Sequence, residues 1–186
     1  MLCVNPLSDL DLSTPKAVSM VPEDVPTWGY EGDGWEKVYG HFDLDLPTER
    51  VRLVRGRQIE YLPYFNAGFV AFPNTPMHDG KTFAELWKDT ARDIDWNCAV
   101  GGKRPWLDQV SLPVTLKRFG IDYNVLPASY NFFTPRMQSH PQVKDAYMLH
   151  YHRHASFKAI PTLEKTKAFL FEAVPSRFHN ALEAVY

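Results

Sequence analysis

The sequence predicts an α/β fold, a mixed sheet flanked by helices, and three stretches of the chain support this prediction. Residues Tyr64–Phe72 have the apolar and aromatic density of a strand buried on both faces inside a sheet. Thr82 and Glu85 form a capping box, which is the signature of a helix start. A second helix is bracketed by Pro105, which suits a first turn, and by Gly120, which suits a C-terminal cap. We expect these helices to pack on the sheet.

The composition excludes several classes of protein. The chain has 186 residues, of which 45% are apolar and 14% aromatic, so it has ample material for a core and is not disordered. Its formal net charge of −2 argues against binding of nucleic acid, which requires a basic face. Two cysteines are too few for a disulfide framework, and no apolar run approaches the roughly 20 residues that span a bilayer. A cytoplasmic protein of one domain, with no transmembrane segment, is therefore expected.

Short strands and one long loop are predicted for the first third of the chain. Met1–Val4 is typical of the end of a strand, and Lys16–Met20 of a short strand. Residues 22–62 are dense in Pro, Gly, Trp and charge, which indicates an elaborated loop with one short helix near Trp35–Phe42. A basic run in this loop has two interpretations: one of its side chains contacts phosphate, or they pair with carboxylates such as Glu49 and Glu60. The run consists of Arg50, Arg52, Arg55 and Arg57.

The later elements follow from periodicity and from the prolines. Apolar side chains recur at helical spacing after the capping box, up to about Trp96. They are Phe83, Leu86, Trp87 and Ile94. Pro113 falls inside the second helix and predicts a kink or a division into two pieces. Beyond it, Tyr123–Leu126 is β-prone, Tyr147–Tyr151 is a predicted strand, and a last helix is expected from about Thr162 to Val174.

Four polar motifs follow one another along these elements. Asn66-Ala67-Gly68 lies in the predicted strand, Asp108-Gln109 lies just inside the second helix, Tyr130-Asn131 follows a proline turn, and His150 ends the last strand. In this order the chain resembles a nucleotide-sugar glycosyltransferase of the type-A fold, closest to the family 8 pattern, over residues 1–158. The resemblance implies the C-terminal portion of that Rossmann-like fold. The family's Asp-x-Asp motif would lie just before the first residue, so residues 1–186 are expected to form a single glycosyltransferase-like domain without its N-terminal nucleotide-binding half.

The resemblance also implies the reaction and its central residues. A sugar would pass from a nucleotide-diphosphate donor to an acceptor that the sequence does not identify, with the help of Mn²⁺ or Mg²⁺. Asp108 and Gln109 are the implied catalytic residues: Asp108 accepts hydrogen bonds from sugar hydroxyls, and the amide oxygen of Gln109 stabilises positive charge at the anomeric carbon. Taken alone, the same Asp-Gln pair is also typical of a helix start favoured by the helix dipole. His150 is the implied metal ligand.

Five residues are the implied substrate-binding set: Asn66, Ala67, Gly68, Asn131 and Lys158. The amide of Asn66 both donates and accepts, which matches vicinal hydroxyls, although a buried Asn bonded to neighbouring main chain has the same sequence signature. Gly68 lets a ligand approach the backbone. Lys158 departs from the family's His-x-x-Gly-x-x-Lys-Pro-Trp pattern, because it stands two positions farther on and the Gly and Pro-Trp are missing.

Two other functions fit the same residues. One is a catalytically silent module that binds a sugar or a partner, because the carboxylate half of the metal site is expected to precede the chain. The other is a small metallohydrolase that uses His150 and His152. Same-face residues of a strand lie about 7 Å apart, so His150, His152 and His154 cannot all bind one ion.

Two further features of the sequence bear on metal binding and on association. The pairs Asp9-x-Asp11 and Asp43-x-Asp45 imitate the Asp-x-Asp motif, but neither follows an apolar strand, and solvated acidic turns are the preferred interpretation. A sheet that lacks its first strands would also expose an apolar edge. Self-association through that open edge is therefore expected.

Overall fold

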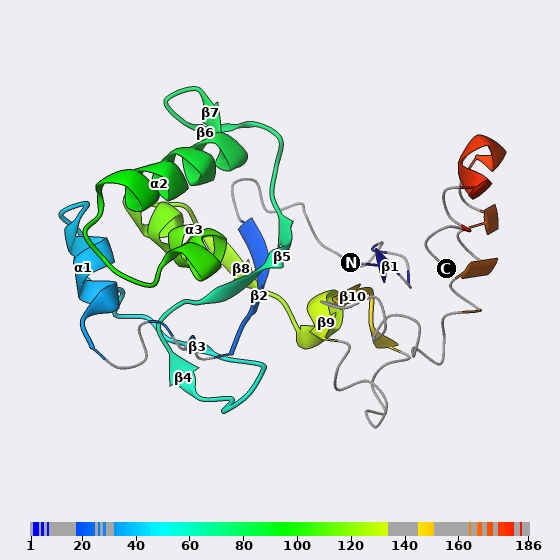
Figure 1. Cartoon of the computed structure of the whole chain (residues 1–186), viewed down its shortest axis with the longest axis horizontal. Helices are drawn as coiled ribbons and strands as arrows, with labels where there is room; N and C mark the ends of the chain where they lie inside the picture. Colours follow the sequence, from blue (N-terminus) through cyan, green and yellow to red (C-terminus); the bar gives the residue numbers. More distant parts are fainter. Residues whose placement is uncertain are drawn as a thin grey trace. The chain divides into compact units, whose positions relative to one another are not determined.

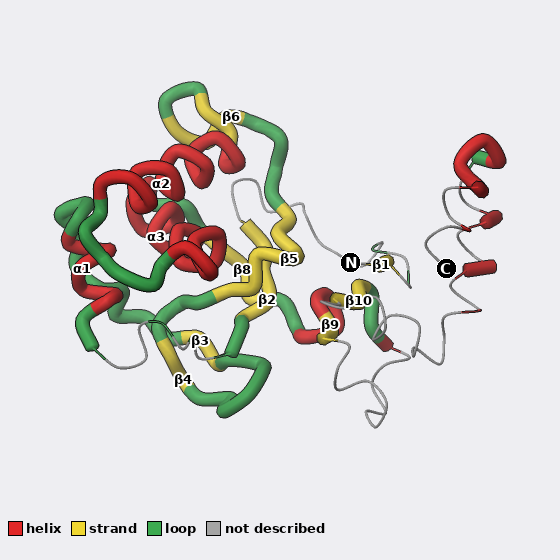
Figure 2. Tube along the Cα trace, in the orientation of Figure 1, coloured by secondary structure: helices red, strands yellow, loops and turns green. Residues whose placement is uncertain are grey.

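The chain divides into two units, a large unit of Leu10–Ala128 and a terminal unit of Met1–Asp9 with Ser129–Tyr186. The computed structural model describes residues 2–3, 5, 7, 18–24, 26, 28, 32–133 and 145–150. It also describes residues 164, 167–168, 171–172, 175–180 and 183 near the C-terminus. Figure 2 shows both helices and strands in the large unit, which confirms the predicted α/β class.

The sheet of the large unit is built around one buried strand. β2 (Val18–Pro22) is buried along its whole length and lies between β5 (Phe65–Ala71) and β8 (Tyr123–Val125). It runs antiparallel to β5 and parallel to β8, so the sheet is mixed, as predicted (Figure 1). A central strand with neighbours on both edges has its backbone groups paired and its apolar side chains covered, which explains the buried run of β2.

β5 is less buried than the sequence predicted. The strand forms within the predicted limits, but burial is restricted to its first two residues, Phe65 and Asn66. Gly68 is exposed and the remaining positions are half-buried. In the part of the chain that the structure describes, β5 pairs with β2 alone, and the prediction of a strand buried on both faces is wrong because cover over β5 ends after its start.

The helix after the capping box forms as predicted. α2 (Phe83–Asn97) begins where the carboxylate of Glu85 accepts hydrogen bonds from the backbone N–H and the hydroxyl of Thr82, at 2.9 and 2.8 Å. These bonds satisfy donors that a helix start leaves without intrahelical partners. The buried side chains recur along one side of the helix, at Phe83, Leu86, Thr90 and Ile94. α2 is therefore an amphipathic helix with one face in the core.

The middle of the second helix is buried on all sides. α3 (Leu107–Phe119) follows the short 3-10 turn η1 (Arg104–Trp106), and every residue from Val110 to Leu116 is buried. It packs against α2 on one side and against β5 on the other (Figure 1), which explains why its sequence lacks a polar face. Pro113 lies inside it, yet the helix is continuous, so the predicted division into two pieces is wrong.

Gly120 ends α3 as the sequence predicted. Its φ of 59° is in the left-handed region, which glycine adopts without steric cost. The turn is closed by the backbone N–H of Ile121, which donates to the carbonyl of Leu116 at 2.9 Å. This bond satisfies one of the last carbonyls of the helix and turns the chain directly into β8.

Three smaller elements complete the large unit. α1 (Gly34–Gly40) matches the short helix expected in the long loop and buries Trp35, Val38 and Tyr39. One hairpin pairs β3 (Val51–Arg52) with β4 (Glu60–Tyr61), and a second pairs β6 (Pro76–His78) with β7 (Lys81–Thr82). The aromatic residues of α1 join the main core, where the ring of Trp35 packs edge-on against Tyr64 with ring centroids 5.8 Å apart.

The terminal unit holds a second small sheet. β10 (Met148–His150) lies between β1 (Leu2–Cys3) and β9 (Phe132–Phe133), antiparallel to the first and parallel to the second. The 3-10 turn η2 (Ala128–Asn131) leads into β9, and η5 (Ser176–Phe178) follows near the C-terminus. Most of the predicted helix 162–174 lies outside the described residues. In the described ranges no helix has the length and apolarity to cross a membrane.

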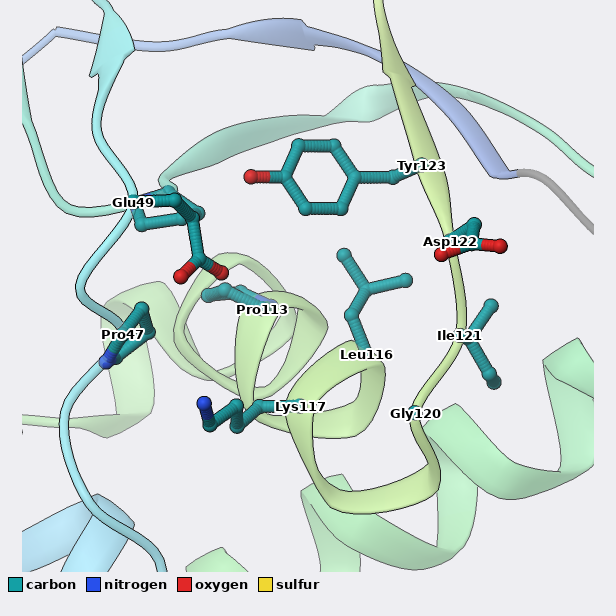
Figure 3. A pocket seen from close by; sticks show the side chains of 10 residues that line it. Pro47, Glu49, Pro113, Leu116, Lys117, Gly120, Ile121, Asp122 and Tyr123 are labelled. Carbon is teal, nitrogen blue, oxygen red and sulfur yellow. The ribbon is translucent and has the colours of Figure 1, made fainter.

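A cavity of about 580 Å³ opens in the large unit at the C-terminal end of α3 (Figure 3). It is bounded by the last turn of α3, by the chain from Gly120 to Tyr123 that leads into β8, and by the segment that carries Pro47 and Glu49. None of the residues singled out from the sequence as catalytic, substrate-binding or metal-binding lines it.

Candidate functional site

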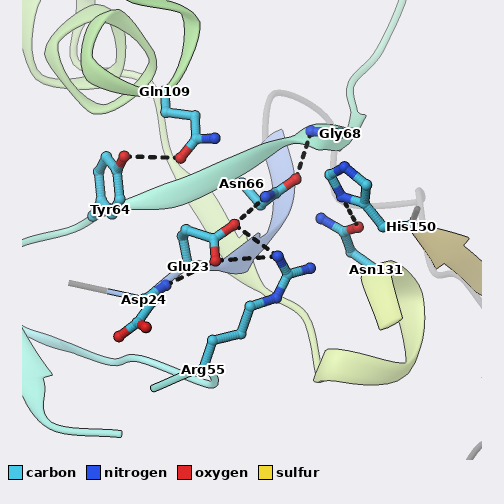
Figure 4. Close-up of polar contacts among 9 residues, drawn as sticks. All are labelled: Glu23, Asp24, Arg55, Tyr64, Asn66, Gly68, Gln109, Asn131 and His150. Atoms are coloured by element: carbon cyan, nitrogen blue, oxygen red, sulfur yellow. Dashed lines mark hydrogen bonds and ion pairs between the residues drawn. The ribbon is translucent and has the colours of Figure 1, made fainter. Parts of the chain in front are cut away.

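A largely buried ion pair lies beside β2 and β5 in the large unit (Figure 4). Glu23 directly follows β2, and Arg55 lies in the turn between β3 and β4. The Nη1 atom of Arg55 donates to both carboxylate oxygens of Glu23, at 3.1 and 2.9 Å. Their side chains are 12% and 14% exposed, so water screens this pair much less than a surface pair.

Asn66 extends the ion pair into a network. Its amide nitrogen donates to the carboxylate of Glu23, and its amide oxygen accepts from the backbone N–H of Gly68 at 2.8 Å. Asn66 is 2% exposed, whereas Ala67 is half-buried and Gly68 is exposed. Protein groups therefore fix the orientation of the amide, and the accessible part of the motif is the backbone at Gly68.

Gln109 is held by a residue that the sequence analysis did not single out. The hydroxyl of Tyr64 donates to the amide oxygen of Gln109 at 2.8 Å. Tyr64 is buried, and this burial raises the pKa of its hydroxyl far above the ordinary value, with smaller contributions from the charges of Glu23 and Asp108. The hydroxyl is thus a permanent donor. Figure 4 shows this pair close to the network around Glu23.

Asp108 points elsewhere, although it precedes Gln109 directly. Successive residues of a helix do not share a face, and Asp108 is exposed in the first turn of α3. One carboxylate oxygen accepts from the backbone N–H of Gln109 at 2.9 Å. Trp106 occupies the N-cap position and no side chain caps α3, so Asp108 is an acidic residue of the first turn, favoured there by the helix dipole, and not a cap. The side chain also lines a cavity of about 410 Å³ between α2 and α3, whose wall includes the cations Lys88 and Arg104.

In the terminal unit the structure brings together two candidate residues from different motifs. The Nδ1 atom of His150, in β10, lies 3.0 Å from the amide oxygen of Asn131, which directly precedes β9 (Figure 4). An amide oxygen only accepts, so Nδ1 is the donor of this bond. Asn131 is 1% exposed, and a buried second residue that fixes the histidine tautomer is typical of metal-binding histidines.

The remaining requirements of a metal site are not met by the described residues. Among them no group of three or more His, Cys, Asp or Glu side chains is arranged to hold an ion. Mn²⁺ and Mg²⁺ prefer oxygen ligands, and His150 alone is an insufficient set. The described residues therefore do not fit an Mn²⁺ or Mg²⁺ centre, and we assign no step of the reaction to an ion.

Several predicted positions lie outside the described residues, namely Asp9, Asp11, His152, His154 and Lys158. The second acidic pair is described: Asp43 and Asp45 are both exposed, and Asp43 has a φ of 54°, typical of a turn. This geometry agrees with the interpretation of a solvated acidic turn.

The arginines of the basic run make different contacts. Arg52 lies 3.8 Å from Glu60 on the exposed hairpin, which is the predicted kind of ion pair. Arg50 donates to backbone carbonyls, and Arg55 pairs with Glu23. The sequence did contain one signal for Glu23, since a carboxylate directly after the buried run of β2 is unusual. Its partner Arg55 lies 32 positions away, and only the tertiary structure shows that the two side chains meet.

The comparison with protein families gives one match. The family of the Rhodobacterales glycosyltransferase domain matches residues 1–120, which is more than half of the 186-residue chain. The matched segment includes Glu23, Arg55, Tyr64, Asn66 and Gln109, and it ends before Asn131 and His150. No curated protein and no solved structure matches the chain. The chain belongs to the Rhodobacterales glycosyltransferase domain family.

Proposed function

We propose that the protein transfers a sugar from a nucleotide-diphosphate donor to an acceptor, on a type-A fold similar to that of family 8 glycosyltransferases. One observation carries the proposal. Within the segment that matches the glycosyltransferase family, Asn66 and Gln109 are each held by a hydrogen bond to another side chain, that of Glu23 and that of Tyr64 respectively. Side chains fixed in this way suit recognition of a sugar, since catalysis depends on groups oriented before the substrate arrives.

The reaction breaks the bond between the anomeric carbon and a phosphate oxygen and forms a bond to an acceptor hydroxyl, which loses its proton. Positive charge develops at the anomeric carbon meanwhile. In the proposal the amide oxygen of Gln109 stabilises that charge, while the hydroxyl of Tyr64 keeps the amide in place. Asp108, which lines the cavity between α2 and α3, accepts hydrogen bonds from sugar hydroxyls on that side of α3.

The leaving nucleoside diphosphate is negatively charged and requires cations nearby. Lys88 and Arg104, on the wall of the cavity beside Asp108, are the described candidates for this contact. Arg104 also pairs with Asp95 at 2.8 Å, so part of its charge is already compensated. Mn²⁺ or Mg²⁺ remains an expectation from the family resemblance, and the test below includes it.

The test is a turnover assay with a panel of nucleotide-diphosphate sugars, run with added Mn²⁺, with added Mg²⁺ and with a chelator. Release of the nucleoside diphosphate reports transfer or hydrolysis. We expect release from at least one donor, and we expect Gln109→Ala to abolish it. Gln58→Ala, an exposed change at the β3–β4 turn, is the matched control and should keep the activity. Absence of release with every donor would reject the proposed reaction.

A catalytically silent binding module is the second candidate function. The amide groups of Asn66 and Gln109 already bond to protein partners, which is the arrangement expected where polar side chains serve the fold alone. Such a module would bind the donor in calorimetry and release no nucleoside diphosphate. Binding without turnover would therefore favour this candidate over the transferase.

A further inference from the structure

The cavity at the C-terminal end of α3 combines an apolar wall with several polar groups (Figure 3). Three prolines line it, Pro47, Pro63 and Pro113, together with the side chains of Leu116 and Ile121. The polar groups are the carboxylates of Glu49 and Asp122, the ammonium of Lys117 and the hydroxyl of Tyr123. The lining thus offers donors, acceptors and an aromatic ring within one cavity of about 580 Å³.

These polar groups are available to a ligand. Within the described ranges, no hydrogen bond or ion pair engages the side chains of Glu49, Lys117, Asp122 or Tyr123. The network around Glu23 differs in this respect, because its carboxylate, guanidinium and amide groups bond to one another. The polar groups around Glu23 already have hydrogen-bond partners in the protein. The polar side chains of the cavity can still form hydrogen bonds with a ligand.

The walls of the cavity are held by the backbone. The guanidinium of Arg50 donates to the carbonyls of Pro47, Thr48 and Glu49, at 2.7, 3.1 and 2.9 Å, which fixes the turn that carries the Glu49 carboxylate. On the opposite side, the turn at Gly120 is closed by the bond from Ile121 to α3. A site whose walls are set before binding loses little conformational entropy when a ligand enters.

A buried hydroxyl of the core is affected by the charge of a residue that lines the cavity. Within the described residues, the hydroxyl of Tyr39 is the buried side-chain oxygen that has no hydrogen-bond partner. Burial raises its pKa, and the charge of Glu49, which lines the cavity, raises it further. Buried polar atoms without partners are rare in native proteins, and such an atom calls for a functional explanation.

We propose that this cavity binds a neutral saccharide, at a site separate from the candidate transfer residues. The choice of ligand class rests on the proposed glycosyltransferase function. Vicinal hydroxyls both donate and accept, which matches carboxylates beside an ammonium and a phenol, while the apolar wall and the ring of Tyr123 suit the C–H face of a sugar. With Glu49, Asp122 and Lys117 the lining has one net negative charge, which disfavours phosphorylated or carboxylated ligands.

The location separates this saccharide from the reacting bond. Lys117 stands eight positions after Gln109 in α3, which corresponds to about 12 Å along the helix axis. A sugar that contacts Lys117 is therefore not the residue that reacts at Gln109. The site would hold an acceptor chain at a distance from its reacting end, so that binding energy remote from the reaction positions the acceptor.

The experiment is an NMR titration of the whole chain with three kinds of probe, without nucleotide sugar. The probes are neutral disaccharides (maltose, lactose and sucrose), glucuronic acid and putrescine. We expect at least one disaccharide to shift the backbone amide signals of Lys117, Gly120 and Asp122 to saturation at millimolar concentration. Glucuronic acid should bind about tenfold more weakly, because of its charge. Saturation by putrescine alone, or by none of the disaccharides, would overturn the proposal.

Variants locate the binding. The double change Glu49→Gln with Asp122→Asn keeps the shapes of both side chains and should weaken disaccharide binding by about tenfold, or about 1.4 kcal/mol. Asp45→Asn, an exposed change on the same segment but outside the cavity, should leave it unaltered. Undiminished binding to a well-folded double variant would place the saccharide elsewhere and reject the site. Because no donor is present, loss of turnover in the transferase assay leaves this result unaffected, and the two proposals fail independently.

Discussion

The Nδ1 atom of His150 lies 3.0 Å from the amide oxygen of Asn131, so two candidate residues share one hydrogen bond. They stand 19 positions apart: His150 ends β10, and Asn131 ends the turn η2 directly before β9, which pairs in parallel with β10. The pairing of the strands thus determines which ring nitrogen of His150 carries the proton. This relationship holds whether the histidine binds a metal or a sugar.

We predict that Asn131→Ala changes the tautomer of His150. In the wild type the bond to the amide oxygen should keep the proton on Nδ1, and without that acceptor the proton should populate both ring nitrogens. Long-range ¹H–¹⁵N NMR spectra of the histidine rings report the tautomer directly. The signals of His78, which lies beside Asp79 on the hairpin of the large unit, serve as the control and should stay the same. An unchanged His150 tautomer would show that this bond does not set it.

We predict that Tyr64→Phe lowers turnover through Gln109. Loss of the hydroxyl removes the donor at 2.8 Å, so the amide of Gln109 can rotate, and kcat should fall by about tenfold or more with little change in KM. The free energy of unfolding should fall by about 1 kcal/mol. Tyr61→Phe also removes one hydrogen bond, from the indole of Trp35 at 2.9 Å, and should reduce stability while keeping kcat. Equal kcat values for the two variants would argue against a positioning role for Tyr64.

Asp108→Asn should impair transfer more than nucleotide binding. The carboxylate is assigned to the sugar, so its loss should lower kcat and leave the affinity for the bare nucleoside diphosphate nearly unchanged. Kinetics and calorimetry on the same preparation separate the two effects. Asp79→Asn, a change at the exposed β6–β7 turn, provides the comparison. If turnover and affinity drop together, the carboxylate acts at the start of α3 rather than on the sugar.

The ion pair between Glu23 and Arg55 should be strongly coupled. A double-mutant cycle with Glu23→Gln and Arg55→Met should give a coupling free energy of about 2 kcal/mol in urea unfolding, because Nη1 of Arg55 contacts both carboxylate oxygens and the pair is largely buried. The exposed pair Arg52 and Glu60 offers a matched cycle on the same hairpin, where about 0.5 kcal/mol or less is expected. Similar coupling in both cycles would contradict the role given to burial.

Asp93 should contribute to the pH dependence of stability. The amide of Asn97, at 2.9 Å, and next the ring of His41, at 3.1 Å, lower the pKa of this carboxyl in the folded state. The stabilisation is therefore fully present above the unfolded pKa of about 3.9, and it is lost as the pH falls through the lower folded pKa.

Asn97→Ala removes the larger of these two causes and tests the assignment. The difference in unfolding free energy between the wild type and this variant should be greatest at neutral pH and should shrink in acid. Urea unfolding at a series of pH values measures it. Asn74→Ala, an exposed change in a loop, should show no such trend. A difference that stays constant with pH would contradict the linkage through Asp93.

Local sequence signals were sufficient for the helices. The capping box at Thr82 and Glu85 determines the start of α2, and Gly120 determines the end of α3, because both depend on hydrogen bonds and backbone angles within one turn. The strand at Phe65–Ala71 was likewise predictable from its own residues. Its degree of burial was not, since that depends on which elements lie against it.

The polar contacts depend on positions far apart in the chain. Asn66 and Gln109 could be chosen from their order in the sequence, but the residues that hold them, Glu23 and Tyr64, lie 43 and 45 positions away from them. The sequence by itself determined the class of fold, the ends of α2 and α3 and the candidate residues. Only the tertiary structure decided their partners and the cavity beside Lys117, because packing of β2, β5 and α3 sets which side chains meet.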